Sequence, residues 1–341
     1  MRSHRRKLRR PKWAHRPGAM RQNPAESEHG PKSVIVARCV QILGGPEDSM
    51  FSGSLVAIVT PMRPDGAVDF AAWERLLDFH LANGTNGVVV AGTTGEGATL
   101  RDSELRELTE RACAHVKGRV PIIVGAGTSS TATTVERVRW LSELPISALL
   151  IVTPAYNRPT QEGLYRHFAA VAEATRVPII LYNIPSRTAV DLLPATVARL
   201  AQLSGIVGVK EGVAQASRVR ELVAACPKDF FVISGDDSTT CESVLAGAKG
   251  VISVTANVAP RGMSDMVAAA LQGQAEEARR LDRRLAALHR NLFLETNPIP
   301  VKWALARMGL MEDGLRLPLT ELSTTHHSQL LADLRAAGVM R

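Results

Sequence analysis

The sequence predicts a (β/α)8 barrel, and three observations support this fold class. Short aliphatic runs alternate with amphipathic segments eight times between residues 55 and 271. This stretch has about the length that such a barrel needs, and polar side chains follow several runs, where a barrel places its functional residues. Thr60-Pro61 follows the first run, whereas a doubly wound open sheet, the competing architecture, favours a G-x-G-x-x-G turn there.

Each expected strand is a short apolar run, as in parallel sheets whose strands are buried on both faces. The strands are expected at residues 55–59, 87–91, 122–126, 148–152, 179–183, 206–210, 230–234 and 251–254. The expected helices carry apolar residues on one face. They are expected at residues 70–81, 134–144, 161–174, 194–203, 216–225, 239–246 and 263–271, with a further helix capped by Asp102.

After Gly273 the pattern is helical throughout, with helices expected at 276–293, 301–308 and 322–334. We therefore expect a barrel catalytic domain at 50–273 and a C-terminal helical domain at 274–341. Residues 1–49 hold 11 Lys/Arg and 4 Asp/Glu, a net of +7. We expect this extension to be disordered or to reflect a misplaced translation start. A transit peptide and a nucleic-acid-binding arm are the alternatives for it.

Composition restricts the partners of the remaining chain. The total net charge is +8, so residues 50–341 carry 8 − 7 = +1, which gives no reason to expect nucleic acid as a partner. Apolar residues make up 45%, yet no run approaches the ~18 that a membrane helix needs. The four cysteines form no C-x-x-C pair, which favours a cytoplasmic protein without a disulfide scaffold.

Lys210 is the central candidate for catalysis. It ends the expected strand at 206–210, and that end of a barrel strand faces the catalytic mouth. An ammonium that is removed from water loses its proton more readily, and the free amine can attack a ketone to form an imine. A solvated lysine at a strand end is the alternative for this position alone.

Further polar groups follow other expected strands. Residues 92–96 form a glycine-containing turn that can approach an anion, and Tyr156 and Tyr182 can transfer protons. Arg187 suits a carboxylate. Each of these residues alone is also typical of a turn, of packing or of the surface. The hypothesis of an active site therefore rests on their common position after the expected strands. The histidines at 80, 115, 167 and 289 fall in expected helices, so we expect no metal.

Four motifs in order give the sequence a resemblance to the dihydrodipicolinate synthase family of class I, pyruvate-dependent aldolases. They are Gly92-Thr93-Thr94-Gly95-Glu96, Tyr182-Asn183-Ile184-Pro185-Ser186-Arg187-Thr188, Gly208-Val209-Lys210-Glu211 and Asn297-Pro298-Ile299-Pro300-Val301-Lys302. The resemblance runs from about Met50 to the C-terminus. It implies a lyase without a cofactor that condenses pyruvate with L-aspartate-4-semialdehyde in diaminopimelate and lysine biosynthesis.

The resemblance also implies the catalytic roles. Lys210 would form a Schiff base with pyruvate, and Tyr182 would exchange protons during imine formation and cyclisation. Thr93 would relay protons between Tyr182 and Tyr156, and Tyr156 would come from a neighbouring subunit of a homotetramer, a dimer of dimers.

Substrate binding is implied in the same way. Thr94 would hold the pyruvate carboxylate with backbone groups around Gly235 and Ile252, and Arg187 would bind the carboxylate of the second substrate. The sequence departs from lysine-inhibited relatives at a regulatory pocket, where Asp102, Ser129, Thr133 and Ala155 replace His, Asn, Glu and Tyr. We therefore expect weak or absent inhibition by L-lysine.

Two other functions remain as alternatives. The first is another pyruvate-dependent class I aldolase, similar to N-acetylneuraminate lyase or a sugar-acid aldolase, although residues 186–188 and Tyr156 favour the synthase. The second is a non-enzymatic barrel with a nucleic-acid-binding arm, supported only by the basic residues 1–49.

Overall fold

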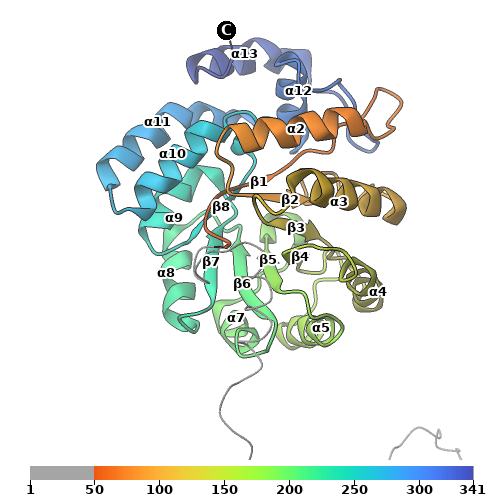
Figure 1. Cartoon of the computed structure of the whole chain (residues 1–341). Helices are drawn as coiled ribbons and strands as arrows, with labels where there is room; N and C mark the ends of the chain where they lie inside the picture. Colours follow the sequence, from red (N-terminus) through yellow and green to blue (C-terminus); the bar gives the residue numbers. More distant parts are fainter. Residues whose placement is uncertain (1–49, 341) are drawn as a thin grey trace, which may run out of the picture. The chain divides into compact units, whose positions relative to one another are not determined.

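The computed structural model describes residues 50–340, in which eight parallel strands close into a barrel with helices around it (Figure 1). Each strand pairs with the next along the chain, and the last pairs with the first. The predicted fold class is therefore confirmed. The strands are β1 Gly53–Ala57, β2 Gly87–Val90, β3 Ile122–Gly125, β4 Ala148–Val152, β5 Ile179–Asn183, β6 Ile206–Glu211, β7 Phe231–Ser234 and β8 Gly250–Ser253.

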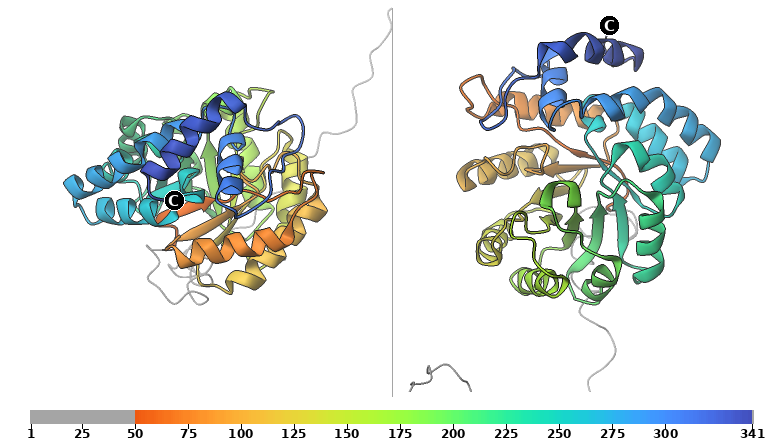
Figure 2. Two further views of the ribbon diagram at one scale, coloured as in Figure 1. Left: turned by 90° about the horizontal axis from the view of Figure 1, so that it is seen from above. Right: turned by 180° about the vertical axis from the view of Figure 1, so that it is seen from behind.

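The helices follow the strands in turn, and the C-terminal ones, blue in Figure 2, gather on one side of the barrel. Around the barrel lie α2 Phe70–Ala82, α3 Asp102–Val116, α4 Thr131–Leu141, α5 Gln161–Glu173, α6 Pro185–Thr188, α7 Pro194–Leu200, α8 Ala216–Ala225, α9 Thr240–Leu245 and α10 Pro260–Leu271. They are followed by α11 Ala275–Asn291, α12 Ile299–Arg307 and α13 His327–Ala336. Short 3₁₀ turns lie at η2 Asp237–Thr239, η3 Thr255–Asn257 and η4 Thr324–His326.

Two domain predictions are not decided by this architecture. The expectations for residues 1–49 lie outside the described residues. Helix α11 packs on α10, and α13 packs on α11 and α12, so the C-terminal helices extend the outer layer of the barrel. The division after Gly273 stays a prediction.

The strands are apolar on both faces because they separate two cores. Alternate residues such as Leu55, Leu150 and Ile252 fill the inside of the barrel. Their neighbours, such as Val56 and Leu149, pack against the helices. This explains why the sequence shows continuous apolar runs instead of strict alternation.

The closure between β1 and β8 needs a residue without a side chain. A β-carbon on Gly250 would lie 2.0 Å from the carbonyl oxygen of Gly53, and Gly250 has a φ of +152°. Only glycine fits this contact, so the barrel can close at this point.

Polar side chains shift two predicted boundaries. The first strand, expected at 55–59, ends at Ala57, because the Asn257 amide donates to Ala57 O at 2.8 Å and accepts from Val59 N at 3.0 Å. The last helix, expected from 322, begins at His327. Leu322 is buried ahead of it, and its carbonyl oxygen lies 3.1 Å from His327 Nε2.

The predicted cap of α3 is wrong. Arg101 is the N-cap residue, and its backbone N–H donates to the Glu104 carboxylate at 2.9 Å. Asp102 is the first residue of the helix and pairs with Arg137, with Nη2 and Oδ1 2.7 Å apart.

Candidate active site

Lys210 lies near the C-terminal end of β6 and faces the inside of the barrel. It pairs in register with Tyr182 on β5 and Ile233 on β7, and both belong to the interior cluster. The lysine is 6% exposed, and its Nζ lies 4.2 Å from the centre of the Tyr182 ring. The amine and the phenol ring are therefore brought together in a site largely shielded from water.

Gly235, directly after β7, leaves room for the lysine side chain. A β-carbon at Gly235 would lie 3.0 Å from Lys210 Cε and 2.9 Å from Glu211 O. The Gly235 N–H donates to the same Glu211 oxygen at 2.7 Å, which fixes the close approach of the two backbones. Ile252 on β8 is 1% exposed and belongs to the interior cluster that also contains Tyr182.

The turn at residues 92–96 is joined to α6 through Asn297. Thr94 is buried, and its Oγ1 accepts a hydrogen bond from Asn297 Nδ2 at 3.0 Å. Arg187 on α6 donates from Nη2 to the carbonyl oxygen of Asn297 at 3.2 Å. One C-terminal residue thus contacts two predicted substrate-binding residues.

A buried ion pair also holds the turn at residues 92–96 in place. Glu96 and Lys302 on α12 form it, and both side chains are 1% exposed. Burial lowers the pKa of Lys302, against the opposing effect of Glu96. The second Glu96 oxygen accepts from Arg316 N at 3.2 Å. Because the charged partner comes from α12, the C-terminal helices hold the turn that carries Thr93 and Thr94.

Arg316 extends this contact to α3. Its guanidinium donates to both oxygens of Glu104, at 2.8 and 2.6 Å. Hydrogen bonding to Arg316 holds the pKa of Glu104 at about 2, well below its usual value. Glu104 therefore stays ionised and keeps Arg316 in place over the physiological pH range.

A cavity of about 560 Å³ opens beside these groups and is lined by Thr93, Tyr182, Arg187 and Asn297. Thr93 and Tyr182 share the cavity, although within residues 50–340 no hydrogen bond joins them. A phenol, a hydroxyl and a guanidinium therefore face a space large enough for small carboxylic acids.

The sequence was compared with known families and structures. The model of the dihydrodipicolinate synthetase family matches residues 50–337. The chain belongs to this family. A 4-hydroxy-tetrahydrodipicolinate synthase from Alkalilimnicola ehrlichii is 55% identical over 289 residues, which are 85% of this chain and 99% of the relative. One from Ectopseudomonas mendocina is 53% identical, over 85% of this chain and 100% of the relative.

Solved members of the dihydrodipicolinate synthase family have the same fold. The chloride-inhibited enzyme from Acinetobacter baumannii, solved with pyruvate, has a TM-score of 0.84 and 46% identity, over 85% of this chain and 99% of that one. The Thermotoga maritima enzyme has a TM-score of 0.84 and 43% identity, over 85% and 100%.

Tyr156 is the predicted family residue that the single chain does not bring into the site. It lies in the loop after β4, has a φ of +73° and is 95% exposed. Asn157 holds this loop to the loop after β3, since its Nδ2 donates to Ser129 O at 3.0 Å. The Tyr156 phenol is therefore directed away from the core of its own chain.

Two of the positions at which a regulatory pocket is predicted line the same cavity. Ser129 and Ala155 line it together with Arg137, which is paired with Asp102. Thr133 lies in the first turn of α4. Asp102 is thus already engaged by a cation, and Ala155 offers no ring.

Asn297, Glu96 and Lys302 belong to the motifs that carry the family resemblance, but the sequence predicts none of their contacts. Their contacts span more than 200 positions of sequence, so spacing gave no signal. A buried lysine in the apolar stretch 299–305 was the clue available.

Within residues 50–340, no helix is long and apolar enough to cross a membrane. No group of three or more His, Cys, Asp or Glu side chains there is arranged to hold a metal ion.

Proposed function

We propose that this chain catalyses the 4-hydroxy-tetrahydrodipicolinate synthase reaction, a lyase-class condensation of pyruvate with L-aspartate-4-semialdehyde. The observation that carries the proposal is the shielded Lys210 amine beside the Tyr182 ring. Membership of the family and the synthase names of relatives at 50% identity and above support the same reaction.

In the proposed mechanism, the Lys210 amine attacks the keto carbon of pyruvate and expels water as an imine forms. Tyr182 supplies the proton for the departing water and takes protons back in later steps. Loss of a methyl proton gives an enamine, whose carbon attacks the aldehyde of the second substrate. The amino group of that substrate then attacks the imine carbon, which closes the ring and releases Lys210.

The two carboxylates have separate proposed partners. Thr94, with backbone groups around Gly235 and Ile252, binds the carboxylate of pyruvate. Arg187 binds the carboxylate of the semialdehyde at the cavity, where its guanidinium offers a planar pair of donors. Its hydrogen bond to Asn297 orients it for this task.

The proton path needs a second subunit in this proposal. Thr93 relays protons from Tyr182 to Tyr156 of a partner, which fits the exposure of Tyr156 on its own chain. We propose a homotetramer built as a dimer of dimers, acting in the cytoplasm on small molecules, without a nucleic-acid or membrane partner.

Trapping with borohydride tests the proposal. Pyruvate and borohydride should add one reduced adduct per chain, and peptide mass spectrometry should place it on Lys210. Lys210→Ala should take no label and should lower kcat by a factor on the order of 10⁴ or more. Labelling at another lysine, or full activity of this variant, would falsify the mechanism.

Acceptor specificity separates the synthase from other pyruvate-dependent aldolases, which would give the same adduct. Among a panel of aldehydes that includes sugar-derived acceptors, L-aspartate-4-semialdehyde should have the highest kcat/KM. A higher kcat/KM for N-acetylmannosamine or a sugar acid would support the alternative aldolase.

A further inference from the structure

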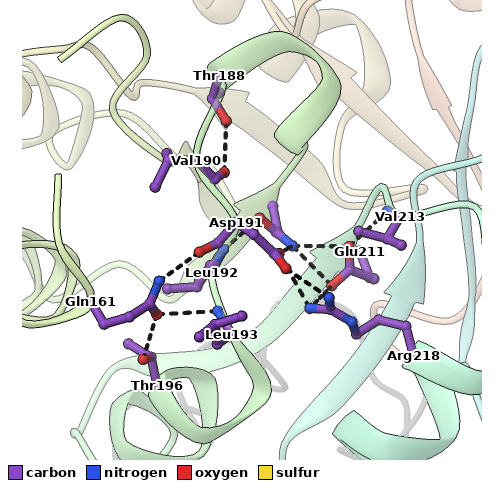
Figure 3. Close-up of polar contacts among 11 residues, drawn as sticks. Gln161, Thr188, Val190, Asp191, Leu192, Leu193, Thr196, Glu211, Val213 and Arg218 are labelled. Carbon is purple, nitrogen blue, oxygen red and sulfur yellow. Dashed lines mark hydrogen bonds and ion pairs between the residues drawn. The ribbon is translucent and has the colours of Figure 1, made fainter. Parts of the chain in front are cut away.

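Four polar side chains meet on the outer face of the barrel wall, and Figure 3 shows three of them, Asp191, Glu211 and Arg218. We call them the rear cluster: Asn183 on β5, Glu211 on β6, Arg218 on α8, and Asp191 between α6 and α7. Asn183 and Glu211 are in register, one position beyond the Tyr182 and Lys210 pair. Because successive side chains of a strand point to opposite faces, the rear cluster lies outside the barrel while the amine lies inside.

The rear cluster is densely hydrogen-bonded. Asn183 Nδ2 lies 2.7 Å from Asp191 Oδ1 and 3.1 Å from each Glu211 oxygen. Glu211 also accepts from Val213 N at 2.7 Å. Arg218 donates to the two oxygens of Asp191, at 2.7 and 3.2 Å. Glu211 is 1% exposed, so its carboxylate depends on these partners instead of water.

The rear cluster also holds the segment after α6, the helix that carries Arg187. Leu192 N donates to Asn183 Oδ1 at 2.9 Å. Gln161 on α5 donates to Asp191 O at 2.7 Å, and its oxygen accepts from Leu193 N at 3.2 Å (Figure 3). Elements that carry Lys210, Tyr182 and Arg187 therefore converge on the partly buried rear cluster.

Opposing effects act on the pKa of the Glu211 carboxyl. Burial raises its pKa to about 7, although the hydrogen bonds from Val213 and Asn183 and the nearby Arg218 favour the ionised form. Asp191 opposes ionisation by like charge. Arg218 from α8 and Asp191 from the segment before α7 are the charged groups that face Glu211.

Protonation would place a hydrogen on one carboxylate oxygen. Both oxygens face the Asn183 amide donor, and Oε2 lies 4.0 Å from Arg218 Nη1. A proton on Oε2 would point a new donor toward Asn183 and Arg218 and weaken acceptance there, while Oε1 keeps its bonds, so the link between β5 and β6 would weaken.

We propose that Glu211 is a positioning residue for the reaction at Lys210. Its ionised carboxylate, through Asn183 and Val213, fixes β6 against β5 and so holds the Lys210 amine beside the Tyr182 phenol. Glu211 touches no substrate in this role. The inference rests on the proposed function, because it concerns the geometry of imine formation.

The first test is Glu211→Gln, which keeps the shape of the side chain and imitates the protonated form. We expect kcat to fall about 10- to 100-fold, since small misplacements of reacting groups are costly. KM for pyruvate should change by less than about twofold, because the carboxylate-binding groups remain. Wild-type kcat should fall as pH drops through about 7, and the variant should lack this limb.

If Glu211→Gln folds poorly, a second variant, Asp191→Asn, tests the same role of Glu211. Asp191→Asn removes the like charge that raises the pKa of Glu211, so the acid limb of kcat should move to lower pH. The matched control is Asp333→Asn on α13, a buried carboxylate that accepts from Asn291 and Gln329. It should keep the wild-type kcat and pH profile.

Two outcomes overturn the inference. One is a folded Glu211→Gln protein with wild-type kcat and an unchanged acid limb. The other is an unfolded Glu211→Gln protein together with an Asp191→Asn enzyme whose pH profile matches wild type. Failure of the proposed function differs from both, because wild type itself would then form no reduced pyruvate adduct at Lys210.

Discussion

The loops after β2 and β4 both carry residues of the proposed active site, yet their surroundings are opposite. The first loop contains Thr94, which is 2% exposed, and Glu96, which is 4% exposed. The second loop contains Tyr156, which is 95% exposed. The first loop is held by the ion pair between Glu96 and Lys302 on α12. In the second loop, the Tyr156 side chain points into solvent.

This difference separates the parts of the proposed site that one chain supplies from the part that needs a second subunit. The chain alone supplies the shielded amine, the nearby phenol and a fastened threonine turn. It does not supply a protected environment for Tyr156. The proposed path therefore begins with groups of a single chain and depends on assembly at its other end.

The largest effect is expected for the buried end of the path. Tyr182→Phe keeps the ring beside Lys210 but removes the hydroxyl. We expect kcat to fall about 10²- to 10⁴-fold, the usual contribution of a general acid or base. Steady-state kinetics measure this loss, and circular dichroism should show an unchanged fold. A variant with at least half of the wild-type kcat would exclude Tyr182 from proton transfer.

At the exposed end of the path, we expect Tyr156 to support catalysis in the active site of a neighbouring subunit. Tyr156→Phe should lower kcat about 10²-fold without unfolding the chain. Mixing it with Lys210→Ala subunits should restore activity, because one chain supplies the amine and the other the phenol. Random exchange in dimers should give about a quarter of the wild-type rate, since half of the dimers are mixed and each has one intact site.

The mixing experiment has a clear contradictory outcome. If exchanged subunits stay as inactive as the separate variants, Tyr156 does not act across the interface. Mass spectrometry of the intact assemblies is the control that mixed species have formed.

Loss of the ion pair between Glu96 and Lys302 should mainly lower the free energy of unfolding. Lys302→Met leaves Glu96 buried without its cation, so the free energy of unfolding should fall by about 3–5 kcal/mol. Urea unfolding measures this change. The double variant Glu96→Gln with Lys302→Met should recover part of the loss, and a single variant as stable as wild type would show that the pair stabilises nothing.

The smallest effect is expected for L-lysine. Ala155 and Thr133 offer neither a ring nor a carboxylate to an ammonium, and Asp102 is already paired with Arg137. Steady-state assays should show weak or absent inhibition. A related synthase from Cyanidioschyzon merolae, 36% identical and solved with lysine bound, is a suitable comparison enzyme. Half-inhibition at low millimolar L-lysine would contradict the prediction.

Local sequence was sufficient wherever one strand or turn decides the structure. The predicted strands at 148–152 and 179–183 have the observed bounds, and Lys210 lies where a barrel strand ends. Alternation within β5 and β6 then places Tyr182 and Lys210 on the same face. These features depend on near neighbours and on a period of two.

Contacts between distant residues could not be predicted in this way. Asn257 ends β1 from 200 positions away, and the four-residue helix α6 that carries Arg187 has no periodic signal of its own. The Asn297 bond to Thr94 is likewise a product of tertiary packing. The expectation that Tyr156 acts in a partner subunit comes only from the family resemblance.

The contact between Gly53 and Gly250 sets an order for biosynthesis. A nascent chain cannot seal its cylinder until the eighth strand has emerged from the ribosome, and long-range pairing of this kind forms slowly. Lys302 emerges later still, so Lys210 and Glu96 are both synthesised before the cation that pairs with the Glu96 carboxylate. A chain that is truncated before residue 302 therefore contains Lys210 but lacks the cation that pairs with Glu96 and holds this turn.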